Sequence, residues 1–291
     1  MPYSARRRPE LATLEIRGLT FQLYRWPGEA PRPIVFVHGW GDTGETFQFL
    51  VDHLSTRHTI VAFDARGFGR TQWPEDGYWF PDYLADLDAL LDVLSPDAPV
   101  DLLGHSMGGN VAMLYAGVRP ERVQRLVNLE GYGLSPTSAA QAPARYREWL
   151  DELKQGTHFA TYDDFDHFAS VLARRNPRTP AERLDFIARS WARQREDGRI
   201  ELRSDPRHKR VNPMLYQRDQ AEACWREITA PVCFVVGALS EVAKRLADAT
   251  AAAHFQQQFR ELSLVTLADA GHMMHHERPR ELAELLEQFL R

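Results

Sequence analysis

Short apolar runs alternate with helical patterns along most of the 291-residue chain. Six of these runs are almost continuously apolar, as expected for strands that are buried on both faces of a parallel sheet. They cover residues 34–37, 59–63, 100–103, 123–129, 232–236 and 262–267. Before them, residues 14–16 and 19–24 predict an antiparallel hairpin around Gly18.

Helical spacing appears between and after these strands. One helix is predicted from Leu84, Leu87, Leu90, Leu91 and Leu94, which share a face. Another is predicted from Leu282, Leu285, Leu286 and Phe289, with Pro279 placed to open it. An order of strand, helix and strand with right-handed crossovers predicts an α/β fold with a doubly wound, mostly parallel sheet.

One stretch interrupts this alternation. Residues 134–225 contain helical patterns but no core strand, which predicts a helical cap inserted into a core made of residues 1–133 and 226–291. Between residues 145 and 218 the chain has 16 Lys and Arg against 12 Asp and Glu, and many aromatic residues. We expect most of these aromatics to pack the cap onto the core and several to face a pocket.

Composition narrows the class of partner. The values of 44% hydrophobic and 26% charged residues are typical of a globular protein, and the net charge of −5 argues against a nucleic-acid partner. The two cysteines, Cys224 and Cys233, imply no disulfide framework. No apolar run approaches the roughly 20 residues that a membrane span needs. These features predict a soluble cytoplasmic protein without a membrane partner, and leave its oligomeric state undetermined.

The chemistry concentrates at Gly104-His105-Ser106-Met107-Gly108-Gly109. This GxSxG motif follows a predicted strand and opens a predicted helix, which is the setting of a nucleophile elbow. Glycines before and after the serine permit a tight turn, and the turn exposes the Ser106 hydroxyl at a helix N-terminus. The pattern therefore predicts a nucleophilic serine.

A nucleophilic serine needs a base, and His272 is the best placed of the 11 histidines. It follows the last strand and precedes the final helix, so its loop returns to the carboxyl edge of the sheet. His275 and His276 could join it in a metal cluster, but the zinc-helix glutamate is missing and Pro279 places the helix later. We therefore expect no metal and no cofactor, and a structural role for His38 and His105.

The chain resembles the α/β-hydrolase family. The matching features are His38-Gly39-Trp40-Gly41, the Asp64 to Gly69 turn, the Ser106 elbow and the terminal Gly271-His272. The likeness is to cap-bearing serine hydrolases of the esterase, cofactor-free haloperoxidase-like and carbon-carbon hydrolase types. It implies an oxyanion hole formed by the backbone amides of Met107 and Trp40. Dehalogenases and epoxide hydrolases of the family carry aspartate at the elbow, so Ser106 argues against both.

The acid that orients His272 departs from the commonest family pattern, which places an aspartate at the position of Ser240. The pattern predicts instead that Ser240 is a helix N-cap, with Glu241 in the first turn of the helix. Glu130 ends the strand next to the nucleophile strand, and some family members take their acid from this point. We therefore expect Glu130 to be the acid. Glu241, Asp219 or a bare Ser-His dyad are the alternatives.

The predicted function is hydrolysis of a small or medium carboxylic ester, or a related acyl compound, through an acyl-enzyme. Two other classes remain open at this point. Gly39, Gly41 and Gly44 match GxGxxG, with Asp64 twenty residues beyond, as in an NAD-dependent oxidoreductase. A hydrolase-like ligand-binding protein with slow turnover is the second, because a fold does not determine a function.

Overall fold

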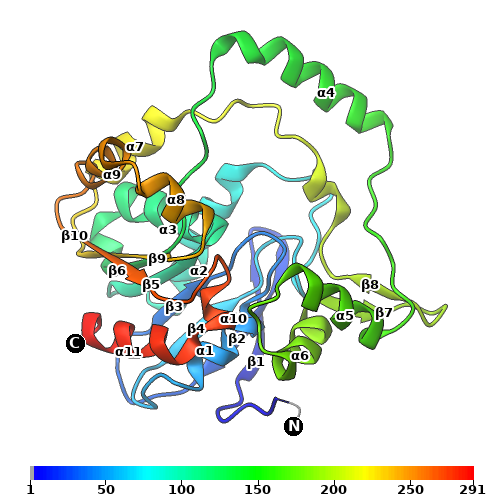
Figure 1. Ribbon diagram of the computed structural model, residues 1–291, viewed down its shortest axis with the longest axis horizontal. Helices are drawn as coiled ribbons and strands as arrows, with labels where there is room; N and C mark the ends of the chain where they lie inside the picture. The colour runs from blue at the N-terminus through cyan, green and yellow to red at the C-terminus, as the bar shows by residue number, and fades with distance from the viewer. Residues whose placement is uncertain (1–2) are drawn as a thin grey trace.

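An eight-stranded sheet forms the centre of the molecule (Figure 1). The strands are β1 (Glu10–Ile16), β2 (Leu19–Trp26), β3 (Ile34–Val37), β4 (Ile60–Phe63), β5 (Val100–His105), β6 (Val123–Leu129), β9 (Val232–Gly237) and β10 (Leu262–Leu267). They lie in the order β1-β2-β4-β3-β5-β6-β9-β10. Strands from β4 to β10 run parallel, whereas the β1–β2 hairpin joins β4 in antiparallel fashion.

The structure is a computed structural model that describes residues 3–291, so the first two residues of the predicted core segment 1–133 lie outside it. All six predicted strands are present, with ends that differ by at most two residues, and so is the hairpin around Gly18. The doubly wound α/β fold is confirmed. Continuous apolar runs predicted these strands well because most of them lack a solvent-exposed face.

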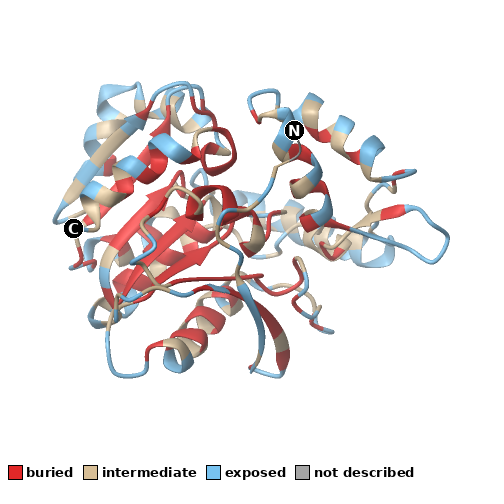
Figure 2. Cartoon of the chain, turned by 90° about the horizontal axis from the view of Figure 1, so that it is seen from below, coloured by how far each residue is buried: buried red, intermediate tan, exposed pale blue. Residues whose placement is uncertain are grey.

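Helices cover both faces of the sheet. The core helices are α1 (Gln48–Val51), α2 (Phe80–Leu94), α3 (Met107–Val118), α7 (Arg218–Arg226), α8 (Glu241–Leu246), α9 (Ala249–Gln256), α10 (Met274–Glu277) and α11 (Pro279–Phe289), with short 3-10 turns η1 (Gly44–Phe47) and η2 (Pro120–Arg122). In β3, Val35 and Val37 face the layer of α2, α3, α7 and α9, while Ile34 and Phe36 face α1 and α11. Figure 2 shows the resulting buried centre of the sheet.

The segment between β6 and β9 holds the insertion. It contains α4 (Ala142–Lys154), α5 (Phe165–Arg175), α6 (Ala181–Trp191), β7 (Ala192–Gln194), β8 (Ile200–Leu202) and the turns η3 (Ala139–Gln141) and η4 (Pro206–Lys209). Helix α4 stands away from the sheet in Figure 1, and none of its residues is buried. Helices α5 and α6 form a small apolar core of their own with Phe49 of α1.

Two details differ from the predicted cap of residues 134–225. The insertion is not purely helical, because β7 and β8 pair as a separate two-stranded sheet. Its last helix, α7, belongs with the core, since Ala221 and Trp225 are buried in the layer beside α3. No helix within residues 3–291 is long and apolar enough to cross a membrane. Cys224 and Cys233 are both free thiols.

Candidate active site

Ser106 lies at a sharp turn between β5 and α3. Its backbone has φ 50° and ψ −114°, a conformation that a side chain strongly disfavours. A Cβ on Gly104 would collide with the carbonyl of Gly108, and a Cβ on Gly108 would collide with the carbonyl of Val37. Close backbone packing on both sides therefore requires the two glycines and holds Ser106 in this strained, half-exposed position.

Glu130 and His272 meet at the carboxyl edge of the sheet. The Nδ1 atom of His272 lies 2.7 Å from the Oε2 atom of Glu130. The Glu130 side chain is fully buried, while the His272 side chain is 46% exposed. Glu130 itself has a positive φ of 58° directly after β6, which turns its side chain toward the neighbouring strand. The structure thus brings together the predicted base and the predicted acid.

The second oxygen of Glu130 has a partner that the sequence did not reveal. Its Oε1 atom accepts a hydrogen bond of 2.8 Å from the backbone amide of Gly237, the last residue of β9. The carboxylate therefore bridges the ends of β6 and β9 and is held on both oxygens. Such a fixed acceptor orients the imidazole that it contacts.

The loop that carries His272 is held by other buried groups. His105 lies beside it, with Nε2 2.8 Å from the main-chain carbonyl of His272 and the two rings 4.8 Å apart. Glu277 accepts a hydrogen bond of 2.6 Å from the amide of Gly271 and one of 3.0 Å from Arg178 of the insertion. These contacts explain how a loop distant in sequence is positioned next to the elbow.

Ser106 directly follows His105, whose ring packs beside His272. Within residues 3–291, no hydrogen bond joins the Ser106 hydroxyl to the His272 imidazole. In the same range, the amides of Trp40 and Met107 donate no hydrogen bond. Unused amides near the serine are the donors that an oxyanion hole needs.

The alternative acids lie elsewhere. Ser240 caps α8, as predicted, because its hydroxyl accepts a hydrogen bond of 3.1 Å from the Ala243 amide. Glu241 points to solvent, where its 78% exposed side chain pairs with Lys244. Asp219 is exposed on α7. Among the described residues, the carboxylate that contacts His272 is that of Glu130.

His38, His275 and His276 are all buried. The structural role of His38 is supported, since Nδ1 lies 2.7 Å from the Gly39 carbonyl and Nε2 accepts from the Ala65 amide. The predicted late helix start is wrong in part, because the one-turn helix α10 precedes Pro279 and carries His275 and His276. His272 lies outside that helix.

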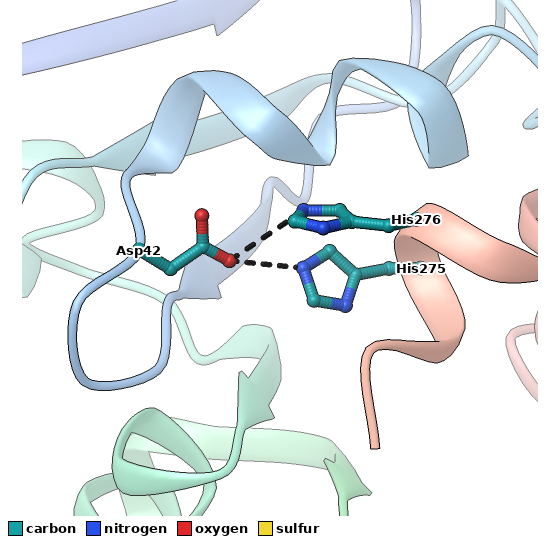
Figure 3. A group of neighbouring side chains, drawn as sticks. All are labelled: Asp42, His275 and His276. Carbon is teal, nitrogen blue, oxygen red and sulfur yellow. Dashed lines mark hydrogen bonds and ion pairs between the residues drawn. The ribbon is translucent and has the colours of Figure 1, made fainter. Parts of the chain in front are cut away.

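His275 and His276 form a buried group with Asp42 instead of His272 (Figure 3). Their Nε2 atoms lie 3.1 and 3.7 Å from Oδ2 of Asp42. Burial lowers the pKa of His276 to about 3, which leaves a neutral imidazole that could ligate a metal. The other Asp42 oxygen accepts from Thr43, Thr46 and Trp191. The group therefore also works as a hydrogen-bond network that ties α10 to the loop after β3.

The dinucleotide-like motif has a local explanation. Asp64 is completely buried, and its carboxylate accepts hydrogen bonds of 2.8 Å from the Gly44 and Arg70 amides. Tyr24 donates a third, at 3.0 Å. The aspartate that could have bound a ribose thus holds the last glycine of the motif, so this arrangement does not form a nucleotide site.

A cavity of about 760 Å³ opens next to the candidate oxyanion amides. Its wall includes Trp40 and Met107 from the core, and Trp149 and Leu153 from α4. Several cap aromatics were expected to face a pocket, without a choice among them, and Trp149 is one that does. Tyr162 and Phe168 instead pack on each other within the insertion, and Phe186 packs the insertion onto Tyr3 and Phe49 of the core.

His208 also borders this cavity and makes stability sensitive to acid. Its ring is stacked against Phe68 and Tyr78, with centroids 3.9 and 3.5 Å away. Burial lowers the pKa of this imidazole from 6.5 to about 3. Between these two values the unfolded chain binds one more proton than the folded protein, so this contribution to stability is complete above pH 6.5 and is lost as the pH falls.

We therefore expect that the free energy of unfolding falls less steeply with acid in His208→Phe than in the wild type. The difference in slope should approach about 1.4 kcal/mol per pH unit. Urea unfolding at about pH 7, 6 and 5 measures it. Parallel curves for the two proteins would show that His208 does not titrate in this way.

The comparisons with known proteins agree with the geometry. The sequence model of the α/β hydrolase fold matches residues 32–279, so the chain belongs to this family. A 2-(acetamidomethylene)succinate hydrolase of Mesorhizobium japonicum is 26% identical over 257 residues, covering 88% of this chain and 87% of that protein. The thioesterase domain from the curacin biosynthetic pathway superposes with a TM-score of 0.81 and 25% identity, covering 96% of this chain and 99% of that one.

A serine hydrolase-like protein of Danio rerio is 34% identical over 148 residues, which are 50% of this chain. The match spans only 44% of that protein's own length. The family model and the hydrolases among its relatives identify the chain as an α/β hydrolase.

Proposed function

We propose that the protein is a serine hydrolase that cleaves a carboxylic ester, or a related acyl compound, through an acyl-enzyme. The observation that carries this proposal is the 2.7 Å contact between His272 and the buried Glu130, beside a serine in the strained elbow conformation. Nucleophile, base and acid follow one another in the chain order of this fold.

In the proposed reaction, the Nδ1–H group of His272 donates a hydrogen bond to the Glu130 carboxylate, which leaves the Nε2 lone pair free to accept the proton of Ser106. The hydroxyl oxygen attacks the carbonyl carbon, and the amides of Met107 and Trp40 stabilise the oxyanion. The imidazolium then protonates the leaving group, and water repeats the sequence on the acyl-enzyme. Glu130 stabilises the transient imidazolium and keeps its orientation.

The insertion acts as the cap in this proposal. Trp149 and Leu153 of α4 share one cavity with Trp40 and Met107, so a substrate bound at the elbow would contact both parts. The free thiols suit the reducing cytoplasmic setting predicted from the cysteine content. A panel of esters, thioesters and lactones, read by product release and by labelling with a fluorophosphonate, tests the reaction class. A lack of labelling and of turnover across the panel would refute the proposal.

Chelation provides a separate test of the mechanism. Because no proposed step uses a metal, we expect that EDTA leaves kcat and KM unchanged. The buried Asp42, His275 and His276 group supplies the specific alternative. If EDTA abolished turnover and zinc restored it, the metal-free mechanism would be wrong, and loss of the zinc effect in Asp42→Asn would locate the ion.

A further inference from the structure

Four arginines line the cavity that Trp40 and Met107 border, namely Arg17, Arg66, Arg207 and Arg210. Three of them are neutralised by carboxylates. Arg17 and Arg66 both pair with Asp86, at 2.9 and 2.6 Å. Arg207 pairs with Asp205 at 2.6 Å. These three guanidinium groups therefore already have carboxylate partners within the cavity wall.

Arg210 differs from the other three. Within residues 3–291 its guanidinium forms no hydrogen bond, and no carboxylate oxygen lies within 4.0 Å of it. Its Nε atom is buried and has no acceptor. A buried donor without an acceptor is costly, typically by about 1–3 kcal/mol, and a charged one costs more. The folded chain itself offers no compensation for this cost.

The backbone around Arg210 is nevertheless well held. Its amide donates to the Arg207 carbonyl at 3.1 Å, and the next amide, that of Val211, donates to Glu152 of α4 at 2.6 Å. The acidic residues Glu75 and Asp76 also line the cavity, but both are exposed and neither pairs with Arg210. An ordered backbone thus presents an unpaired cation to the cavity.

We propose that Arg210 binds a carboxylate of the substrate, so that the preferred substrates are acyl compounds carrying a second, ionised carboxyl group. This inference rests on the proposed function, which places the reacting carbonyl near the amides of Trp40 and Met107 in the same cavity. The planar guanidinium fork matches a carboxylate in shape and charge. Binding through the terminal guanidinium nitrogens would give this cation the partner that the described residues do not supply.

Two esters of equal chain length test the proposal: mono-4-nitrophenyl adipate, which is charged, and 4-nitrophenyl hexanoate, which is neutral. We expect the wild type to prefer the adipate ester. Arg210→Gln should lower the ratio of the two kcat/KM values by about 10- to 100-fold, chiefly through KM, because a charged hydrogen bond is lost. Arg210→Lys should retain part of the preference, since the charge remains without the fork.

Arg174→Gln is the matched control. It removes the same charge from the same insertion, but at an exposed position outside the cavity, so the ratio should stay at the wild-type value. A ratio that is unchanged in Arg210→Gln, or equally reduced in Arg174→Gln, would overturn the proposal. In both cases turnover of the hexanoate ester would leave the serine-hydrolase assignment intact.

Binding gives a readout that does not depend on turnover. In the Ser106→Ala background, calorimetry should show tighter binding of monomethyl adipate than of methyl hexanoate, and Arg210→Gln should remove the difference. Equal binding of the two esters before this change would reject a carboxylate site. If the wild type cleaved no ester while the adipate preference in binding persisted, the proposed reaction would fail and the anion site would stand.

Discussion

Replacing Ser106 by alanine is expected to reduce turnover by about 10⁴- to 10⁶-fold while the fold and substrate binding are retained. Removal of the nucleophile from a triad leaves only the residual catalysis of the oxyanion hole and of binding. The hydroxyl makes no hydrogen bond to His272 in the described structure, so its loss breaks no such contact. Backbone packing at Gly104 and Gly108 holds position 106 at a positive φ. Alanine would adopt the same backbone conformation, so the substitution does not relieve the strain.

The measurement is turnover of a chromogenic ester together with fluorophosphonate labelling, and circular dichroism checks the fold. Ser170→Ala, at an exposed position on α5, is the control and should label as the wild type does. If Ser106→Ala still labelled or turned over substrate at near-normal rates, the nucleophile would have to be sought elsewhere and the serine-hydrolase proposal would fall.

Glu130→Gln is expected to lower kcat by about 10²- to 10⁴-fold. Glutamine keeps the shape of the side chain, but a neutral amide neither stabilises the imidazolium nor selects the tautomer with a free Nε2 atom. The amide nitrogen can also face Nδ1 of His272 at the 2.7 Å contact, which would favour the wrong tautomer. The effect should appear in kcat rather than in KM, because Glu130 is buried away from the substrate.

Glu241→Gln is the matched control, since it makes the same chemical change at the exposed alternative acid. Its turnover should stay within about twofold of the wild type, because surface ion pairs such as that with Lys244 contribute little. Thermal unfolding of both variants separates loss of catalysis from loss of fold. A folded Glu130→Gln enzyme with near-normal turnover would exclude Glu130 as the orienting acid, and a large loss in Glu241→Gln would point to the alternative.

The strands were predictable because their signal is local. A run such as residues 34–37 is apolar at every position, and burial on both faces of a parallel sheet requires that pattern. The elbow is local in the same sense, since the glycines flanking Ser106 are adjacent in sequence to the strand and helix that they join. The end of the insertion was harder to predict from the sequence, because helical spacing alone does not tell whether α7 packs on the core or on the cap.

The candidate site depends partly on the residue pattern and partly on tertiary contacts. Residue types and order along the chain sufficed to nominate Ser106, His272 and Glu130, because each lies at the carboxyl end of a strand or in the loop after one. Which acid reaches His272 was decided by the fold: the positive φ of Glu130 and the amide of Gly237 direct its carboxylate across the end of β9. Neither contact can be predicted from the residues that surround Glu130 in the sequence.

Other pairings also depended on the tertiary structure alone. The meeting of Asp42 with His275 joins residues more than 230 positions apart, and the unpaired state of Arg210 becomes visible only when the neighbouring arginines are seen with their carboxylates. The sequence by itself therefore determined the α/β class, the strands and the candidate nucleophile and base, since these follow from periodicity and turn chemistry. The tertiary structure decided which charged groups are satisfied and which remain free, because that depends on long-range packing.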